Sequence, residues 1–413
     1  MFVLLGVSIG NAAFAGPSFK YGTYGTLNLH RSNVYKNIQD NDPQKRWRVD
    51  LERLTFETET KFSQRLELET EIEIEHGGTG STLEFDSFHE FGEFESEVEQ
   101  GGEVKLEKIQ LLYQAKNWLN LKMGYLGVPI GWTSSRDLPT DYFSVERNRA
   151  EAQIIPSAWR EVGVGFSGDI GNWVYEYAYV TAPNSEFFRK YNWIAGGSRR
   201  RFESNFADAF AHVFRLDYGF ARDHNAIGAA VYSGNGTPNR QKTGKLTDSS
   251  GVFIADIHAL YSWHGLKVRG LYLRGFLDNA ELVSQANSSL SGLANPGVYS
   301  TVGRQAEAAY LEAGYDLSNL WPEYFSNNFD VFLRYDHWDT MKLPPKDGIK
   351  DPRFEETQWT GGINAYLTPE VLVKAEYAQA RSGLASLAVD HRIAFGLGFK
   401  YFPTKGDGTH ANE

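Results

Sequence analysis

Cysteine is missing from this 413-residue chain, and methionine occurs only three times. Without cysteine there is no disulfide framework, no thiolate zinc site and no thiol nucleophile. Long apolar runs are also missing, because no stretch after residue 15 approaches the ~18 residues that a membrane-spanning helix needs. No proline-rich linker divides the chain and no repeat of fixed period recurs, which favours one domain and argues against a propeller.

Aromatic residues and glycine, by contrast, are abundant. The chain has 10 Trp, 22 Tyr, 27 Phe and 41 Gly, in a composition that is 41% hydrophobic and 23% charged. This aromatic content excludes a disordered chain. Because the mean hydropathy is nevertheless negative, at −0.43, the composition favours one large all-β architecture over the two or three ordinary domains that the length alone suggests.

The first fifteen residues are apolar and end in the small-x-small site Ala13-Phe14-Ala15. We predict a secretory signal peptide over residues 1–15, so that the mature chain begins at Gly16. No Lys or Arg precedes the apolar run, so either the true start lies upstream or the sequence is truncated; the alternative is a buried N-terminal element. An exported chain without membrane helices is either soluble or a transmembrane β-barrel.

Period-two alternation of apolar and polar residues recurs along the chain and indicates β-strands. In 66–75, for example, leucine, threonine and isoleucine alternate with five glutamates. We predict sixteen strands, near 19–30, 46–62, 66–75, 104–115, 119–126, 161–168, 173–181, 206–219, 225–233, 251–264, 266–277, 304–317, 329–338, 357–366, 370–380 and 391–402.

The links between these strands alternate between seven short and eight longer ones, and the 318–328 link is long for its class. Outer-membrane barrels have short periplasmic turns and long outer loops, and an even strand number leaves both ends on the periplasmic side. We therefore predict an all-β fold over 16–402, a single 16-stranded antiparallel transmembrane β-barrel with a polar, wet lumen. A polar periplasmic tail, 403–413, follows.

Aromatic residues near strand ends fit interfacial girdles, with ordinary core residues as the alternative. They are Trp47, Trp118, Trp173, Trp263, Trp338, Trp359 and Tyr401.

Several blocks resemble the phosphate-selective O/P porin family of Gram-negative outer membranes. The resemblance is carried by 71–79, 90–95, 97–104, 124–131 and 154–165, and is strongest over about 67–169. It implies a homotrimer of sixteen-stranded barrels whose pores are narrowed by an inward-folded constriction loop, at the position of 127–160 here. The chain departs from the family in charge, because 52 acidic residues outnumber 41 basic ones, whereas phosphate-selective members carry basic ladders. The polar tail after the last strand is a second departure.

A ladder of glutamates is the first candidate site. Alternate strand positions project to one face, and charges cannot cheaply face lipid, so these carboxylates are expected to line the pore. The field then either favours cations or is cancelled by salt bridges. The ladder consists of Glu57, Glu59, Glu67, Glu69, Glu71, Glu73 and Glu75.

The expected constriction loop is the second candidate site, since its mixed charges would set a transverse field across the narrowest zone. Its charged candidates are Arg136, Asp137, Asp141, Glu146, Arg147, Arg149 and Arg160. The arginines Arg147, Arg149 and Arg160 either contact anions or pair with the wall glutamates.

Two charged loops complete the candidates. The acidic segment 84–107 either holds a divalent cation through carboxylate oxygens or is a solvated face. Arg189, Lys190 and the run 199–201 either contact lipopolysaccharide phosphates or are simply solvated. No catalytic, metal or cofactor site and no nucleic-acid partner is predicted.

The sequence thus predicts a porin of the Gram-negative outer membrane, not an enzyme, through which small hydrophilic or ionic solutes diffuse passively, with a preference for cations. Outer-membrane lipid and lipopolysaccharide would surround it. An anion- or phosphate-selective channel is the main alternative. An outer-membrane enzyme such as a lipid hydrolase and a soluble exported carbohydrate-binding β-protein are alternatives from other classes.

Overall fold

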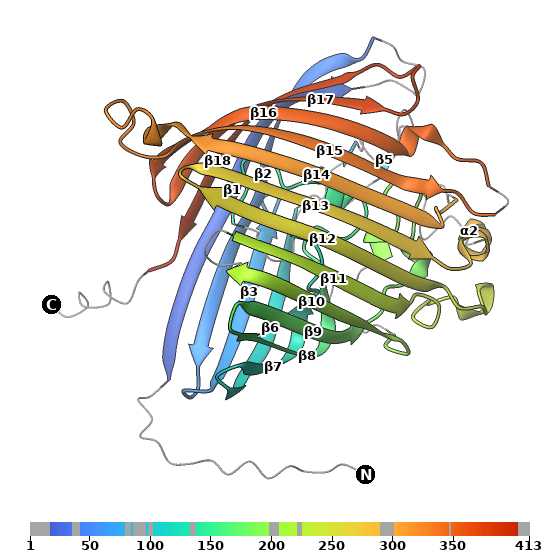
Figure 1. Ribbon diagram of the computed structural model, residues 1–413. Coiled ribbons are helices and arrows are strands. Elements are labelled where there is room, and N and C mark those ends of the chain that lie inside the picture. Colours follow the sequence, from blue (N-terminus) through green and yellow to red (C-terminus); the bar gives the residue numbers. More distant parts are fainter. Residues whose placement is uncertain are drawn as a thin grey trace.

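Sixteen antiparallel strands close into one barrel in the computed structural model (Figure 1). Strand β1 pairs with β18, which closes the circle, and every other barrel strand pairs with its neighbours in chain order. The structure describes residues 17–34, 42–78, 84–85, 96–97, 102–132, 138–197, 206–220, 225–289, 301–346 and 348–403. The predicted signal peptide, 1–15, and all of the predicted tail except Pro403 lie outside these residues.

The barrel strands match the sixteen predicted strands one for one. They are β1 (Ser18–Val34), β2 (Gln44–Lys61), β3 (Leu66–Glu75), β6 (Glu103–Lys116), β7 (Leu119–Gly127), β8 (Arg160–Ile170), β9 (Trp173–Thr181), β10 (Phe210–Phe220), β11 (Asn225–Asn235), β12 (Gly251–Trp263), β13 (Leu266–Leu277), β14 (Gln305–Asp316), β15 (Phe329–Leu343), β16 (Glu355–Thr368), β17 (Val371–Ser382) and β18 (Asp390–Tyr401). The predicted fold class is therefore confirmed.

Short elements occupy the connections. They are the two-stranded sheet β4 (Glu84–Phe85) and β5 (Ser96–Glu97), the helices α1 (Arg149–Ala152) and α2 (Ala280–Ser288), and the 3-10 turns η1 (Ser185–Phe187), η2 (Ala195–Gly197), η3 (Thr243–Lys245), η4 (Leu317–Asn319) and η5 (Pro352–Phe354). No helix in the described part of the chain is long and apolar enough to cross a membrane.

Short and long connections lie at opposite ends of the barrel, as predicted. We call these ends the turn rim and the loop rim. Strand β1 begins and β18 ends at the turn rim, and the long 318–328 link forms a turn that contains η4. Helix α2 follows β13 at the loop rim (Figure 1).

The outer face of the barrel is apolar. Val49 is 74% exposed, and Ile227 and Ile257 are also strongly exposed, whereas Arg53 and Arg334 on inward positions are buried. Successive side chains of a strand point to opposite faces, so the alternation in sequence becomes an apolar exterior with polar groups inside. This is the arrangement that a barrel in lipid requires.

The aromatic residues predicted near strand ends are about half-exposed, with one exception. Trp338 is only 2% exposed, so its assignment to an outer girdle is wrong. Its position in β15 shares the parity of Arg334 and Asp336, which are also buried. Trp338 therefore points inward, where the guanidinium of Arg149 lies 5.4 Å from its ring centre.

The expectation of a polar lumen fails over a large part of the interior, which we call the apolar sector. Here many inward residues of β9 to β14 are apolar and are buried under residues of three long loops. Burying each large aliphatic side chain contributes roughly 1.5–3 kcal/mol, so this half of the barrel is packed like a protein core. The wall contributes Ala178, Val180, Ala211, Val213, Ala230, Tyr232, Val252, Ile254, Leu271, Leu273, Ala306 and Ala308, and the loops contribute Val128, Ile130, Trp132, Ile154, Ile155, Trp159, Phe188, Trp193, Ile194 and Val283.

Candidate functional site

The glutamate ladder lies on the inner face of β2 and β3, as predicted. Glu71 and Glu73 are each 2% exposed, while Ile72 between them is 44% exposed on the outside. The register places Glu57 opposite Glu71 and Glu59 opposite Glu69. Like charges directly across a ladder are destabilising, so these carboxylates need cations nearby. We call this surface, with the inner face of β6 and with Arg160 of β8, the charged wall.

Lysines partner the ladder toward the turn rim. Lys20 Nζ lies 2.6 Å from Glu59 Oε2, and Lys61 Nζ lies 3.3 Å from Glu67 Oε2. Glu69 receives a hydrogen bond of 2.6 Å from the Gln110 amide and lies 3.4 Å from the ammonium of Lys108. These side chains keep partial solvent exposure, so this part of the wall borders water.

Arginines and a lysine partner the ladder toward the loop rim. Arg160 donates a 3.2 Å hydrogen bond to Glu71, and the Arg53 guanidinium lies 3.9 Å from Glu73. Lys105 Nζ lies 2.8 Å from Glu75 Oε2 and 3.7 Å from Glu73 Oε1. The wall is therefore salt-bridged along its length, as one of the two predicted alternatives requires.

Acidic groups nevertheless outnumber basic ones on the charged wall. The seven ladder glutamates, with Glu103 and Glu107 of β6, make nine carboxylates. The cations that pair with them include six residues, namely Lys20, Lys61, Lys105, Lys108, Arg53 and Arg160. At full ionisation the nine carboxylates exceed these six cations by three, so these ion pairs alone do not neutralise the wall.

The predicted constriction loop, 127–160, folds into the lumen and crosses to the opposite wall. Lys374 of β17 donates hydrogen bonds of 2.8 and 2.9 Å to the carbonyls of Tyr142 and Ser144. Arg269 of β13 donates to the Asp141 carbonyl at 2.9 Å, and Glu376 accepts from the Val145 amide at 2.7 Å. Buried charges from the far wall thus hold the loop by its backbone.

The charged residues of the constriction loop are mostly engaged with the wall. Glu146 pairs with Arg392 of β18. Arg147 lies 3.9 Å from Glu52, and Arg149 reaches Gln358 at 3.4 Å and stacks on Trp338. Arg160 belongs to the charged wall. The pairing alternative therefore holds for Arg147 and Arg160, while Arg136 and Asp137 lie outside the described residues.

The link between Glu146 and Arg392 is electrostatically strong. Burial alone would raise the pKa of the Glu146 carboxyl, but Arg392 and His30 lower it to about 2. The carboxylate is thus ionised at any pH above the strongly acidic range.

Sequence analysis missed the buried charges that receive the loop. They occur as charged pairs two residues apart on one strand: Arg215 and Asp217, Asp256 and His258, Arg334 and Asp336, Lys374 and Glu376. All are buried and inward-facing. The signal was present, because two charges on alternate strand positions must share the inner face.

Of the two charged loops, the structure tests the prediction only at Arg189 and Lys190. Arg189 is 7% exposed, and its guanidinium donates to the carbonyls of Glu186 and Phe188, so it is neither solvated nor available to phosphates. Lys190 lies against the Phe354 ring. The run 199–201 and most of 84–107 lie outside the described residues. Among the residues that are described, no group of acidic and histidine side chains could hold a metal ion.

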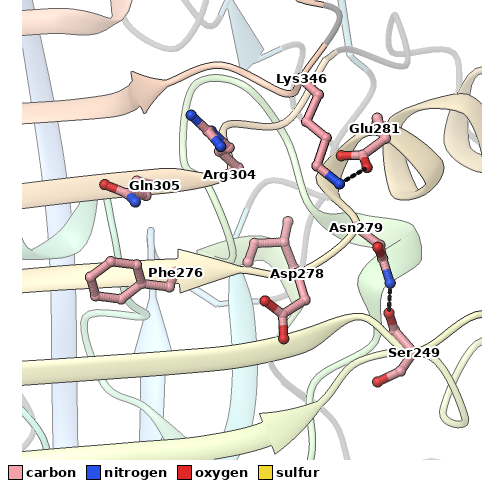
Figure 2. Close-up of a pocket in the computed structure, with 9 residues that line it drawn as sticks. Ser249, Phe276, Asp278, Asn279, Glu281, Arg304, Gln305 and Lys346 are labelled. Carbon is pink, nitrogen blue, oxygen red and sulfur yellow. Dashed lines mark hydrogen bonds and ion pairs between the residues drawn. The ribbon is translucent and has the colours of Figure 1, made fainter.

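A separate hollow of about 380 Å³ lies at the loop rim, where β13 passes into α2 (Figure 2). Figure 2 shows Lys346 reaching Glu281, at 3.3 Å, and Asn279 bonded to the Ser249 carbonyl, at 2.8 Å. The residues that line this hollow lie in or next to the loop-rim ends of β12 to β15. The hollow is therefore distinct from the charged wall.

Comparison with known proteins supports the fold. No protein-family model matches the chain. An uncharacterized protein of Aquifex aeolicus (strain VF5) is 25% identical over 363 residues, which cover 87% of this chain and 74% of that protein.

Two solved structures resemble the barrel. The outer membrane channel DcaP of Acinetobacter baumannii aligns with a TM-score of 0.56 and 12% identity, over 94% of this chain and 98% of that one. The trimer form of OmpT, an outer membrane protein of Vibrio cholerae, aligns with a TM-score of 0.52 and 10% identity, over 94% and 100%. The chain thus has the fold of Gram-negative outer-membrane porins.

Proposed function

We propose that the protein is a porin of the Gram-negative outer membrane that lets small hydrophilic or ionic solutes diffuse through a water-filled passage and prefers cations. Residues 1–15 would be removed as a signal peptide, 403–413 would form a periplasmic tail, and three copies would assemble. The trimer form of the Vibrio cholerae protein supports this assembly, and a sixteen-stranded barrel is wide enough for a channel.

The charge balance of the charged wall carries the proposal. Carboxylates outnumber the paired cations on this wall, and at its turn-rim end Glu59, Glu67 and Glu69 keep partial solvent exposure. The apolar sector fills the other side, so solutes would pass along the acidic surface. A pore lined by net negative charge attracts cations and repels anions.

An anion- or phosphate-selective channel is the second candidate, and the O/P family resemblance favours it. It would need cationic side chains along the passage. The buried cations of the far wall instead hold the constriction loop, as Lys374 and Arg269 do, so they are less accessible to a solute than Glu59, Glu67 and Glu69 near the turn rim are.

Planar-bilayer recording tests the proposal directly. We expect stepwise single-channel currents, and a reversal potential in a KCl gradient that has the sign of potassium permeation. An absence of current would sink the channel and favour the enzyme or the soluble binding protein. A reversal potential of the chloride sign would sink the cation preference and restore the phosphate-type interpretation.

A variant pair makes the test specific. Replacing Glu67 and Glu69 by Gln removes two of the three excess charges and should move the reversal potential toward zero. Glu323→Gln is the matched control, because Glu323 is exposed in the turn between β14 and β15 and should leave the reversal potential unchanged. An equal shift in both proteins would contradict a role of the charged wall.

A further inference from the structure

A cluster of four buried charges holds the backbone of one residue of the constriction loop. On β10 lie Arg215 and Asp217, and on β12 lie Asp256 and His258, all at most 6% exposed. Asp256 Oδ2 accepts a 2.9 Å hydrogen bond from the Gly131 amide, and Arg215 Nη1 donates one of 2.7 Å to the Gly131 carbonyl. Both polar atoms of this residue are thus held by the wall.

The loop residues fit this grip closely. Gly131 has a φ of +70°, and a Cβ there would lie 2.1 Å from Glu151 Oε1, so only glycine is accommodated. The next residue, Trp132, lies with its ring 5.1 Å from the Arg215 guanidinium and 4.7 Å from the His258 ring. Its backbone amide donates to Glu151. The loop is therefore fixed at this point in one arrangement.

His258 is the centre of the cluster. Its Nδ1 lies 2.5 Å from Asp256 Oδ1, and its Nε2 lies 2.6 Å from Asp217 Oδ1. A neutral imidazole has one donor, whereas two ionised carboxylates can only accept, so both contacts are hydrogen bonds only when the ring carries two protons. The imidazolium and Arg215 then balance the two aspartates.

No charged residue lies directly opposite His258 on the neighbouring strands, although Arg269 of β13, which is buried and paired with Glu312, faces the same interior. The residues opposite His258 are Gly228 on β11 and Leu271 on β13. From the loop, Trp132 contacts the ring edge-on, and the Glu151 carboxylate accepts a hydrogen bond from the Trp132 amide. The positive charge of His258 therefore lies beside two negative charges, Asp217 and Asp256, and one positive charge, Arg215. Glu151 adds a further negative charge beyond Trp132.

We infer that His258, in its doubly protonated form, is the positioning residue of the constriction loop: with Asp217, Asp256 and Arg215 it forms a latch that holds Gly131 against the wall. Removing one proton leaves one aspartate without a donor and gives the four residues a net negative charge. The Asp256 carboxylate then loses the imidazolium donor that orients it, so its hold on the Gly131 amide weakens. The latch deepens the proposed channel function, because it would set the width of the passage.

Thiol labelling tests the latch without relying on conduction. The chain has no cysteine, so Ile130→Cys places a single thiol in the loop at a fully buried position. In the folded barrel this thiol should react slowly at neutral pH. Gln110→Cys on the charged wall serves as the partly exposed reference that corrects for thiolate content at each pH.

We expect His258→Gln, made in the Ile130→Cys background, to speed labelling at least about tenfold at neutral pH, since losing one charge-assisted hydrogen bond shifts an equilibrium by that order. In the protein with His258 intact, labelling should accelerate as the pH rises. Asp217→Asn removes one acceptor that favours the imidazolium. In this variant the pH at which thiol labelling accelerates should therefore be lower by roughly one unit or more. A purely structural role would leave that midpoint in place.

The outcomes separate this inference from the channel proposal. A labelling rate that changes neither with pH nor in the two variants would overturn the latch, even in a protein that conducts normally. If His258→Gln does not fold, the midpoint shift of Asp217→Asn alone decides. A protein that labels as expected but passes no current would keep the latch and overturn the channel.

Discussion

The charged wall and the apolar sector line the same barrel, yet they use the inward strand positions in opposite ways. On β2 and β3 these positions carry mostly glutamates, with cations at hydrogen-bonding distance. On β9 to β13 many of them carry alanine, valine and leucine, covered by tryptophans from the loops. The first surface keeps water and an excess of negative charge, and the second excludes water and anchors the loops.

We therefore expect the apolar sector to determine the stability of the barrel and the charged wall to determine its ion selectivity. Substitutions in the apolar sector should change the free energy of unfolding, because they remove packing. Substitutions at the exposed end of the charged wall should change permeation, because surface ion pairs contribute little to stability. Three predictions test this separation, from the largest effect on stability to the smallest.

Truncating Trp193 should cause the largest loss of stability. The side chain is fully buried, its ring packs on Gly275, and its indole Nε1 donates a 2.9 Å hydrogen bond to the Gly303 carbonyl. We expect Trp193→Ala to lower the free energy of unfolding by about 3–5 kcal/mol, measured by urea unfolding in lipid vesicles. Trp321→Ala, in an exposed turn, is the control and should cost much less. Equal losses would mean that the apolar sector is not a packed core.

The pair of Glu146 and Arg392 should give an intermediate effect that depends on pH. The pKa of Glu146 is lowered to about 2, below the value of ~4.3 for an unperturbed glutamate. A lowered pKa contributes stability above the unfolded value, which is lost as the pH falls through the folded value. We expect this contribution, about 3 kcal/mol, to disappear between about pH 4 and pH 2.

Unfolding of the wild type and of Glu146→Gln across this range measures the effect. The variant should be less stable at pH 6 and should approach the wild type near pH 2. A constant difference at every pH would show that the carboxylate contributes by packing alone.

The pair of Lys20 and Glu59 should matter least for stability. Both side chains are about half-exposed, although their charged atoms lie 2.6 Å apart. We expect Lys20→Gln to change the free energy of unfolding by less than ~1 kcal/mol, and to shift the reversal potential slightly further toward cations. A large loss of stability would show that the exposed end of the wall is structural as well.

The sequence predicted the sixteen strands and the charged wall because both are local patterns. Leu66 to Glu75 alternate so regularly that only one face can meet lipid. The apolar sector was missed because strands such as β11 and β13 carry apolar residues on both faces, with Ile227 outside and Tyr232 inside. Alternation of polarity cannot show which apolar side faces lipid and which faces a packed loop.

The anchoring of the constriction loop was missed for a different reason. Lys374 and Tyr142 are 232 residues apart, and nothing local to either residue indicates the other. Trp338 illustrates the same limit, since its neighbour Arg149 belongs to a distant loop. Parity with Arg334 and Asp336 would have placed Trp338 inside, but its nearness to a strand end suggested a girdle.

The central claim is that solutes pass along the charged wall while the apolar sector stays closed. Single cysteines test it in this cysteine-free chain: Gln110→Cys lies on the wall, and Ala230→Cys lies buried in the sector. A charged, thiol-specific reagent added during single-channel recording should reduce the current through Gln110→Cys and leave Ala230→Cys unchanged. Block of Ala230→Cys with no effect on Gln110→Cys would place the passage on the other side of the barrel and contradict the account.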